Sequence, residues 1–518
     1  MSFFSKKQNL GFAAIILAIS TLLSRLMGLI RDKVISWQFG ASSEADMYFA
    51  AFVIPDIINY LLAGGFMSIT IIPLFAKRLK ENVEDAWKFF SCILSWMTVL
   101  ATILTLIAIL NAEYLAKIIA PGFNEIQKLR LAFFMKLVLP AQIFFLIGTC
   151  FTSILYIRRQ FQIPALSPLI YNGAIILFGV LWPLIFSAKE GMTGYCVGVS
   201  IGAFFGAFLL PIYMVYKGGL TISINFKHNL LHKFLIIALP LMLGQTVIML
   251  DEQFLRVFGS LVGDGQVSLL NYARRISQVP VGLVGQAAAV ASYPFLVNLL
   301  AQGDKITFNQ TLNKAFKNSL TIIIPCAFYM VATAYQIISI IFQGGNFIEQ
   351  NTINTVPLAQ IMLSMTPFWI FYMILVRAYY AEEDTLTPAV TGTILTIVII
   401  PIYLYIAIPY GSFAIALTSG ISVAIYTIWL TIIWIKRHDS SPFKGILPHL
   451  LKLFIAVIPS TILAYMINDA SYDILNSYLP FTGLTKTLIV SCLTSLWSLI
   501  MFLGFFVPIA KMIKIRIV

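Results

Sequence analysis

Long apolar stretches recur along this chain from Leu10 to Pro508, and short connections rich in charged and turn-forming residues separate them. Most stretches hold about 20 residues, the length at which a helix crosses roughly 30 Å of hydrocarbon. They are continuously apolar, whereas the strands of a membrane barrel would alternate apolar and polar residues, so a barrel is not expected. The pattern predicts about fourteen membrane-spanning helices, at residues 10–30, 47–76, 89–110, 131–156, 165–187, 192–216, 234–255, 267–300, 318–343, 356–380, 388–407, 411–435, 450–468 and 485–509.

Composition supports the same fold class, an all-α polytopic membrane protein. The 518-residue chain is 59% hydrophobic and only 11% charged, whereas soluble domains carry about 25% charged residues. A soluble globular protein is therefore excluded. The net charge of +13 would suggest a nucleic-acid partner in a soluble protein. In a membrane protein it is explained by basic cytoplasmic loops, so no nucleic acid is expected.

The basic residues are distributed unevenly over the connections. Clusters follow the second, fourth and twelfth predicted helices, namely Lys77, Arg78, Lys80 and Lys88, then Arg158 and Arg159, then Lys436, Arg437 and Lys444. Basic residues favour the cytoplasmic side of a membrane. Placing both termini and the even-numbered connections in the cytoplasm assigns most of the 34 Lys and Arg to that side, and this is the topology we predict.

Two polar connections resemble each other and predict a duplicated architecture. They are Tyr156–Pro168 and Val376–Pro388, about 220 residues apart, and each ends in a proline near the start of the next helix. Repeated halves of this kind are typical of membrane transporters. We therefore predict two pseudo-symmetric six-helix lobes, at about 1–220 and 228–440, and two additional C-terminal helices within 445–518.

Helix-breaking residues occur in corresponding helices of the two predicted lobes. The second predicted helix contains Pro55, Gly64 and Gly65, and the eighth contains Pro280, Gly282 and Gly285. Proline and glycine weaken a helix at such positions. Both helices are therefore expected to be interrupted.

Charged residues inside the first predicted span need a partner or an aqueous cavity. Each charge costs about 2.5 to 3.5 kcal/mol at the centre of a membrane helix on insertion scales. Arg25 and Asp32 are seven residues apart and share nearly one helix face, with Gly28 between them able to permit a bend. Arg31 points elsewhere on a straight helix. An interfacial position near lipid headgroups is the alternative for Arg31, and snorkelling to the surface is the alternative for Arg25.

The eighth predicted helix carries Arg274 and Arg275 about two turns inside its apolar run. Adjacent residues point about 100° apart, so at most one of them can face a cavity squarely. Guanidinium groups suit bidentate binding of phosphate oxygens. Arg25 and Arg275 from opposite lobes could thus bind a diphosphate headgroup. The competing explanation is ion pairing within the protein, for example Arg256 with Glu252, or Asp46 or Asp251 with an arginine.

Other clusters give weak signals. His228 and His232 have the spacing of metal ligands but lack a third ligand nearby, so an interfacial polar segment is favoured. The acidic group Glu382–Asp384 could hold Mg²⁺ but is expected to be a solvated connection. No nucleophile and base can be assembled from the sequence. We therefore expect no catalytic residue, no metal site and no cofactor.

Several segments of the chain resemble one known family. They are LSRLMGLIRD (Leu23–Asp32), EADMYFAAFVIPD (Glu44–Asp56), IAPGF (Ile119–Phe123), FQIPALSPLIYN (Phe161–Asn172), GQVSLLNYARRISQVPVGL (Gly265–Leu283), IIFQGGNF (Ile340–Phe347) and RAYYAEEDTLTP (Arg377–Pro388). Together they resemble the MurJ (MviN) family of lipid II flippases, within the multidrug/oligosaccharidyl-lipid/polysaccharide exporter superfamily. The resemblance follows the order of the predicted helices from the first to the twelfth.

This resemblance implies a non-enzymatic flippase of the bacterial inner membrane. It implies a V-shaped pair of six-helix lobes around a central cationic cavity, with two extra helices that form a lipid-facing groove. The transported partner would be the undecaprenyl-diphosphate-linked peptidoglycan precursor needed for cell-wall synthesis. Membrane lipids would be the other partner, and the resemblance identifies no protein partner.

The resemblance also implies roles for particular residues. Arg25, Arg31 and Arg275 match family arginines associated with headgroup binding, and Asp32 and Asp46 match acidic positions of the cavity and its outer gate. Arg274 accompanies Arg275 at the cavity. The chain departs from the family at Asn59, where a further cavity arginine is common. That departure leaves open a different polyprenyl-linked substrate.

Two rival functions remain on sequence grounds. A related transporter could carry another polyprenyl-linked glycan or small organic cations, although a cation exporter should present acids rather than arginines to its cavity. An integral-membrane enzyme acting on polyprenyl phosphates would need paired carboxylates or histidines at the interface, and only Glu382–Asp384 offers any.

Overall fold

The computed structural model describes residues 10–63, 66–186, 190–513 and 515, and almost all of them are helical. The predicted all-α class is therefore correct. Ten helical stretches in the described part of the chain are long and apolar enough to cross a membrane. Among the described residues, each of the fourteen predicted ranges falls mostly on helical residues, but fourteen membrane crossings stay a prediction.

The chain divides into two compact units. Unit 1 comprises residues 1–35 and 42–264, and unit 2 comprises residues 36–41 and 265–518. The chain passes between the units within and just after α1 (Leu10–Phe39) and again at Asp264. The predicted lobes, 1–220 and 228–440, stay a prediction. The helix expected to open the second lobe, α12 (Leu231–Gly259), packs against helices of unit 1.

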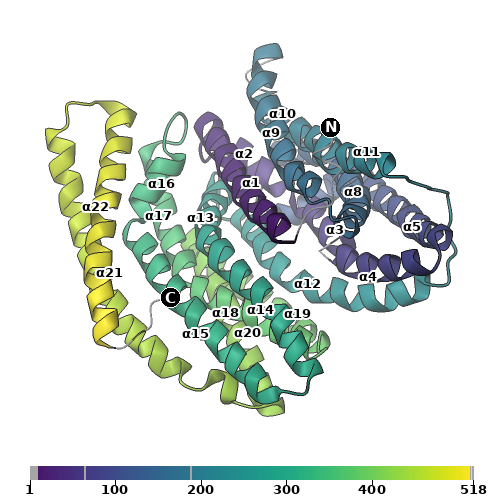
Figure 1. The fold of residues 1–518 in the computed structure, drawn as a ribbon. Coiled ribbons are helices and arrows are strands. Elements are labelled where there is room, and N and C mark those ends of the chain that lie inside the picture. The colour runs from purple at the N-terminus through teal and green to yellow at the C-terminus, as the bar shows by residue number, and fades with distance from the viewer. Residues whose placement is uncertain (1–9, 64–65, 187–189, 514, 516–518) are drawn as a thin grey trace. The chain divides into compact units, whose positions relative to one another are not determined.

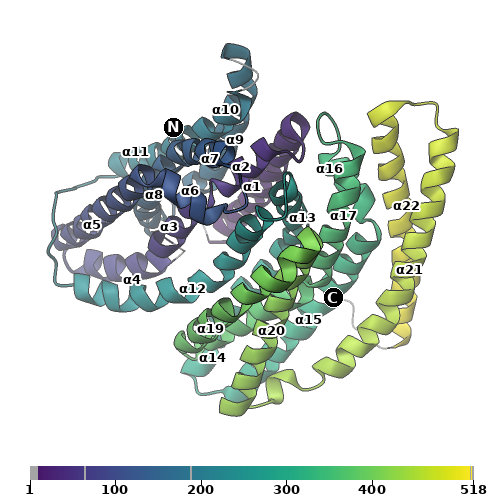
Figure 2. The same cartoon turned by 180° about the vertical axis from the view of Figure 1, so that it is seen from behind.

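Unit 1 contains most of α1 and eleven further α-helices in the described residues (Figures 1 and 2). After α1 they are α2 (Ser43–Ala50), α3 (Val53–Ala63), α4 (Phe66–Glu81), α5 (Val83–Leu110), α6 (Ala112–Ile119), α7 (Glu125–Val138), α8 (Pro140–Ile157), α9 (Gln162–Ile185), α10 (Gly191–Gly202), the π-helical η2 (Ala203–Leu209), α11 (Leu210–Lys217) and α12. The helix α9 packs along α10, and α12 packs along α3 and α4.

Unit 2 contains the remaining helices. They are α13 (Gln266–Pro280), the π-helical η3 (Val281–Gly285), α14 (Gln286–Ala301), α15 (Lys305–Ala332), α16 (Ala334–Phe342), α17 (Glu349–Ser364), α18 (Thr366–Ala381), α19 (Leu386–Ile402), η4 (Tyr403–Ala407), η5 (Ile408–Tyr410), α20 (Gly411–Arg437), η6 (Ser441–Phe443), α21 (Ile446–Tyr478) and α22 (Gly483–Met512). The last two form a hairpin that packs on α15 and α16 (Figure 1, yellow).

The predicted interruptions occur in both helices. The second predicted helix is interrupted between α2 and α3, where Ala51 and Phe52 form a turn. Within it, α3 ends at Ala63, and Gly64 and Gly65 lie outside the described residues. The eighth is divided at Pro280, where α13 gives way to the wider π-helical turn η3 before α14. Proline lacks a backbone N–H and disturbs the regular α-helical hydrogen bonds, which accounts for the change at that point.

The two similar connections have the same backbone conformation. Arg159 after α8 and Glu383 after α18 have φ angles of 58° and 61°, and they are the described non-glycine residues with positive φ. The amide of Gln160 donates to the carbonyl of Leu155, and the amide of Asp384 donates to that of Tyr379, at 2.9 and 3.0 Å. All these positions correspond at an offset of 224 (383 − 159). The sequence similarity thus reflects a repeated helix–turn–helix geometry.

The end of α1 is held within unit 2 by the loop after α16. The amide of Asn346 donates to the carbonyl of Trp37 at 2.8 Å, and the hydroxyl of Ser36 donates to that of Phe342 at 3.1 Å. Gly345 has a φ of 57°, and a Cβ there would lie 2.2 Å from the carbonyl oxygen of Trp37. Only glycine fits this position, because it accepts positive φ and adds no side chain.

Candidate functional site

The charged residues of α1 form a local network in unit 1. Arg31 donates from Nε and Nη2 to one carboxylate oxygen of Asp32, at 3.0 and 2.9 Å. Its Nη1 donates to the side-chain oxygen of Asn172 on α9 at 3.2 Å. The Arg31 side chain is 13% exposed and that of Asp32 is 0% exposed. Arg31 therefore has an ion pair within the protein, whereas the alternative expected for it was an interfacial position.

Asn172 is a site residue that the sequence reasoning missed. It closes the network on the side of α9, and its own amide donates to the carbonyl of Pro168 at 2.9 Å, which fixes its orientation. A lone amide in the apolar run 165–187 was the available signal, because polar side chains in a membrane helix are costly without a partner. With Asn172 in place, the guanidinium of Arg31 is held in one direction.

Arg25 lies on α1 about a turn and a half before Arg31 and is half-buried. Two other predicted residues follow α1 in the sequence. Asp46 is fully buried in the first turn of α2, where a carboxylate is favoured by the helix dipole. Asn59 lies half-buried on α3. The roles expected for Arg25, Asp46 and Asn59 stay predictions.

Arg274 and Arg275 are both on α13 in unit 2, and their surroundings differ. Arg274 is 7% exposed, and its guanidinium lies 4.6 Å from the ring centre of Trp369 on α18. Arg275 is half-buried. Adjacent residues on a helix point about 100° apart, and which of the two faces a cavity stays a prediction. Arg25 and Arg31 belong to unit 1, so a cavity shared with Arg275 stays a prediction.

A second ionic cluster in unit 1 joins α12 to α3. Arg256 donates from Nη1 to a carboxylate oxygen of Asp56 at 2.7 Å and from Nη2 to Glu252 at 2.8 Å. The amide oxygen of Gln253 accepts a further hydrogen bond from Nη1 at 3.0 Å. The predicted pairing of Arg256 with Glu252 is confirmed. The sequence reasoning missed Asp56, whose signal was a carboxylate in an apolar run directly after Pro55.

The weaker clusters have structural partners. His228 accepts a hydrogen bond from the amide of Leu230 at 3.1 Å and lies 3.4 Å from Asp85. Asp384 accepts hydrogen bonds from the amide and hydroxyl of Thr387, at 2.9 and 2.6 Å, near the start of α19. Within the described residues no group of three or more His, Cys, Asp or Glu side chains could hold a metal ion.

Two of the predicted site arginines have neighbours that orient them, namely Asp32 and Asn172 for Arg31 and Trp369 for Arg274. A guanidinium has five N–H donors in a fixed plane and remains charged when partly buried. Such groups bind phosphate oxygens through paired, charge-assisted hydrogen bonds. Recognition of an anionic group by these arginines stays a prediction.

Comparison with known proteins identifies the family. A family model described as lipid II flippase MurJ matches residues 35–482. A probable lipid II flippase MurJ of Borreliella burgdorferi is 27% identical over 464 residues, which cover 89% of this chain and 90% of that protein. The corresponding protein of Treponema pallidum is 24% identical over 515 residues, covering 94% and 95%.

Solved structures share the fold. The inward closed conformation of lipid II flippase MurJ has a TM-score of 0.72 at 23% identity, covering 95% of this chain and 99% of that chain. An inward-facing multidrug resistance MATE family transporter of the MOP superfamily has a TM-score of 0.68 at 16% identity, covering 85% and 99%. Because the family match spans most of its length, the chain belongs to the lipid II flippase MurJ family.

Proposed function

We propose that the chain is a flippase that moves lipid II, the lipid-linked peptidoglycan precursor, across the bacterial inner membrane for cell-wall synthesis. The observation that carries the proposal is the match of the MurJ family model to residues 35–482. Relatives that are named probable lipid II flippase MurJ also align with this chain over nearly their whole length. The chain acts as a transporter and breaks no bond in its substrate.

Arg25, Arg31 and Arg275 bind the diphosphate of the headgroup in this proposal. The hydrogen bonds from Arg31 to Asp32 and Asn172 support it, because a guanidinium that is already oriented loses less freedom on binding. Each charge-assisted hydrogen bond to an ionised group contributes about 1.5 to 3 kcal/mol. Three arginines could therefore hold a diphosphate strongly in a cavity of low dielectric constant.

The remaining predicted residues border this cavity or its outer gate. Asp32 and Asp46, both fully buried, hold arginines or close the gate, and Arg274 positions α13 through its contact with Trp369. Transport then follows alternating access, in which two six-helix lobes move against each other around the bound headgroup. Both chain termini lie in the cytoplasm.

The two C-terminal helices hold the isoprenoid tail. Apolar side chains on α21 and α22 are exposed, including Ile455 at 60%, Met466 at 62%, Leu496 at 62% and Ile500 at 56%. An exposed apolar surface on a membrane helix suits contact with hydrocarbon chains. A photoreactive polyprenyl lipid should therefore crosslink to α21 or α22.

The test replaces the chromosomal gene with variants and measures lipid II on each side of the inner membrane. Arg25→Ala and Arg275→Ala should each abolish transport at normal expression, Lys should restore part of it, and Glu should be worse than Ala. The control is Arg159→Ala, which removes an exposed loop arginine. Normal transport by both alanine variants would contradict the headgroup site.

A second substrate class is favoured by one residue. Asn59 stands where the family commonly has a cavity arginine, so a different polyprenyl-linked glycan is the alternative cargo. Asn59→Arg separates the two: improved lipid II transport indicates that lipid II is the native cargo. If wild type transports no lipid II and depletion causes another polyprenyl-linked glycan to accumulate, the alternative is correct.

A further inference from the structure

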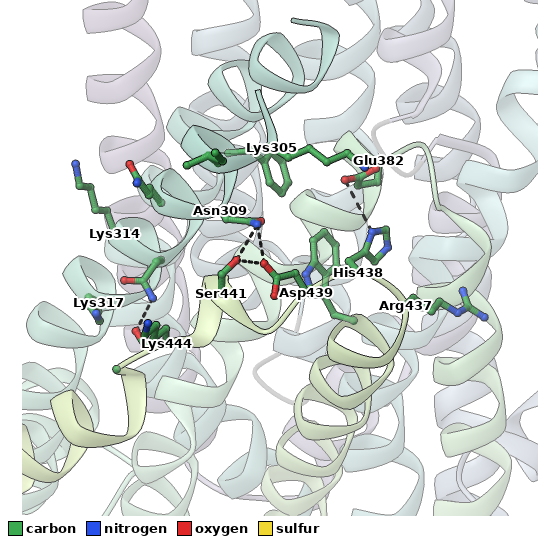
Figure 3. A pocket seen from close by; sticks show the side chains of 16 residues that line it. Lys305, Asn309, Lys314, Lys317, Glu382, Arg437, His438, Asp439, Ser441 and Lys444 are labelled. Atoms are coloured by element: carbon green, nitrogen blue, oxygen red, sulfur yellow. Dashed lines mark hydrogen bonds and ion pairs between the residues drawn. The ribbon is translucent and has the colours of Figure 1, made fainter. Parts of the chain in front are cut away.

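A pocket of about 960 Å³ lies within unit 2, remote in sequence from the arginines of α1 and α13 (Figure 3). It forms where the first turns of α15 meet the end of α20, the short helix η6 and the start of α21. The connection from α18 to α19 contributes Glu382 to its wall. The pocket is therefore built by helix ends and not by the middle of any apolar span.

The lining of this pocket is strongly basic. It includes five Lys and Arg side chains but only two carboxylates, those of Glu382 and Asp439. Glu382 lies 4.0 Å from His438. Asp439 accepts hydrogen bonds from the hydroxyl of Ser441 and from the amide of Asn309, and the Ser441 hydrogen bond keeps the pKa of Asp439 below its usual value. Both acidic groups thus have partners already.

Three lysines gather on one side of the pocket, namely Lys314, Lys317 and Lys444 (Figure 3). No carboxylate in the described part of the chain lies within ion-pair distance of their ammonium groups. By contrast, Arg437 points away (Figure 3) and pairs with Asp384 at 3.4 Å, and Lys305 extends toward Glu382 (Figure 3). The three lysines therefore form an uncompensated cluster of positive charge.

Trp434 gives an independent indication of a ligand. It lines the pocket and is 1% exposed, yet its indole N–H has no hydrogen-bond partner among the described residues. The ring is fixed by His438, stacked at 4.5 Å, and by Tyr379, edge-on at 4.9 Å. Buried donors are nearly always satisfied by protein, water or ligand, so this donor calls for an acceptor.

The start of α21 adds backbone donors close to the lysines. Its N-cap is Gly445, which has no side chain to accept a hydrogen bond from the first turn. The ammonium of Lys317 lies 3.2 Å from the point where a Cβ on Gly445 would be. A helix N-terminus with free amides and a neighbouring ammonium favours negative charge.

We propose that this pocket is a second anion site, which binds a phosphate-bearing group through Lys314, Lys317 and Lys444 and through the indole N–H of Trp434. A phosphate or diphosphate offers several acceptor oxygens to donors that come from different walls, and a pocket of this volume accommodates more than one phosphate. The group belongs either to a phospholipid headgroup or to a soluble diphosphate. The site is independent of the transport proposal.

The soluble source is tested with inorganic pyrophosphate and the full-length chain in neutral detergent, by titration calorimetry. The lipid source is tested with nanodiscs of phosphatidylcholine that contain phosphatidylglycerol, by counting the phosphatidylglycerol molecules retained after extraction. Saturable pyrophosphate binding supports the site with a soluble ligand, and selective retention of phosphatidylglycerol supports it with a lipid. Absence of both would overturn the proposal.

Two variants show whether any binding occurs at this pocket. Lys314→Ala, Lys317→Ala and Lys444→Ala combined should weaken binding at least about tenfold, and Trp434→Phe should weaken it about threefold or more while keeping the ring packing. The control combines Lys77→Ala, Lys80→Ala and Lys227→Ala, which removes the same charge from exposed positions outside the pocket. Equal losses in the control and the pocket variant would assign binding to net charge and refute the site.

Folding of the variants is checked by the melting temperature in detergent. If the triple variant fails to fold, binding is measured instead for Lys314→Ala, whose native side chain is exposed, and for Trp434→Phe. Binding unchanged in both would refute the site. Binding at this pocket should also weaken as salt concentration rises, because exposed charges are screened.

Discussion

Arg256 of α12 and Asp56 of α3 are 200 residues apart in sequence, yet a hydrogen bond of 2.7 Å joins their side chains. The guanidinium is nearly buried, with 7% of the side chain exposed, whereas the carboxylate is 28% exposed. Glu252 completes the cluster from the preceding turn of α12. This pair links α12 to α3 within unit 1.

Removing one partner of this pair should destabilise the protein. Asp56→Ala leaves the buried guanidinium with the carboxylate of Glu252 and the neutral amide of Gln253. It should cost about 1 to 3 kcal/mol, because a buried charge that loses one of its partners is unfavourable. The measurement is thermal unfolding in detergent. Glu252→Gln is the control and should cost less, since it leaves the 2.7 Å contact intact. A charge swap of Asp56 and Arg256 should recover part of the loss, and no recovery would argue against a direct interaction.

The network around Arg31 should show graded effects. Asn172→Ala removes one hydrogen bond, worth about 1 kcal/mol, and should reduce lipid II transport a few-fold. Asp32→Ala removes the carboxylate that holds two guanidinium nitrogens and should reduce transport more than about tenfold. Transport by both variants is measured at matched expression. Equal effects would mean that Asn172 does more than orient the arginine.

The loop that holds the end of α1 should not tolerate a side chain at Gly345. Ala there adopts a φ of 57° and would approach the Trp37 carbonyl to 2.2 Å, so we expect a loss of about 3 kcal/mol or more from strain and displacement. Gly219→Ala is the matched control: its φ is 83°, but no atom lies within 4 Å of the added Cβ. It should cost only about 1 kcal/mol. Similar melting temperatures for the two variants would contradict the close contact.

The predicted topology can be tested with exposed positions beside two helix starts. Ile126 at the start of α7 is 80% exposed, and Val83 at the start of α5 is 58% exposed. In a background that lacks the exposed native Cys492, a membrane-impermeant maleimide should label Ile126→Cys in intact spheroplasts and should label Val83→Cys only after permeabilisation. The opposite pattern would invert the topology.

The positive φ angles after α8 and α18 predict a stabilising substitution. A non-glycine residue with positive φ destabilises the folded state by about 1 to 2 kcal/mol. Glycine removes this strain, but it also makes the unfolded chain more flexible, which offsets part of the gain. Arg159→Gly and Glu383→Gly should therefore each raise stability by about 0.5 to 1 kcal/mol. Arg158→Gly should lower it, because Arg158 donates to the carbonyls of Val215 and Gly219. The melting temperatures in detergent check both directions.

The sequence predicts the helices well because apolar periodicity and helix breakers act locally. The range 411–435 corresponds to α20, and Pro280 marks a real change of helix type. The pairing of Arg256 with Glu252 was also accessible, since residues four apart meet on a helix. The range 318–343 was expected as one helix but is divided at Thr333 between α15 and α16.

Contacts between distant segments could not be predicted from one sequence. Nothing local in Asp56 or Asn172 shows that an arginine from another helix reaches it. The basic pocket is equally hidden, because α15, the end of α20 and the start of α21 meet only after the helices of unit 2 have packed. The spacing of apolar residues along the chain predicts the helices, whereas these sites form only through tertiary packing.

The matching turns after α8 and α18 have the same backbone conformation but carry side chains of opposite charge. One turn carries Arg158 and Arg159, and the other carries Glu382 and Glu383, although the main-chain hydrogen bonds correspond. Those hydrogen bonds use backbone atoms alone. The charge of the side chains in the turn can therefore change from positive to negative without altering the path of the backbone. One turn thus carries two positive charges, while its counterpart supplies the acidic side chain of Glu382 to the wall of a basic pocket. A repeated turn of this kind lets two connections with the same backbone geometry carry opposite charges.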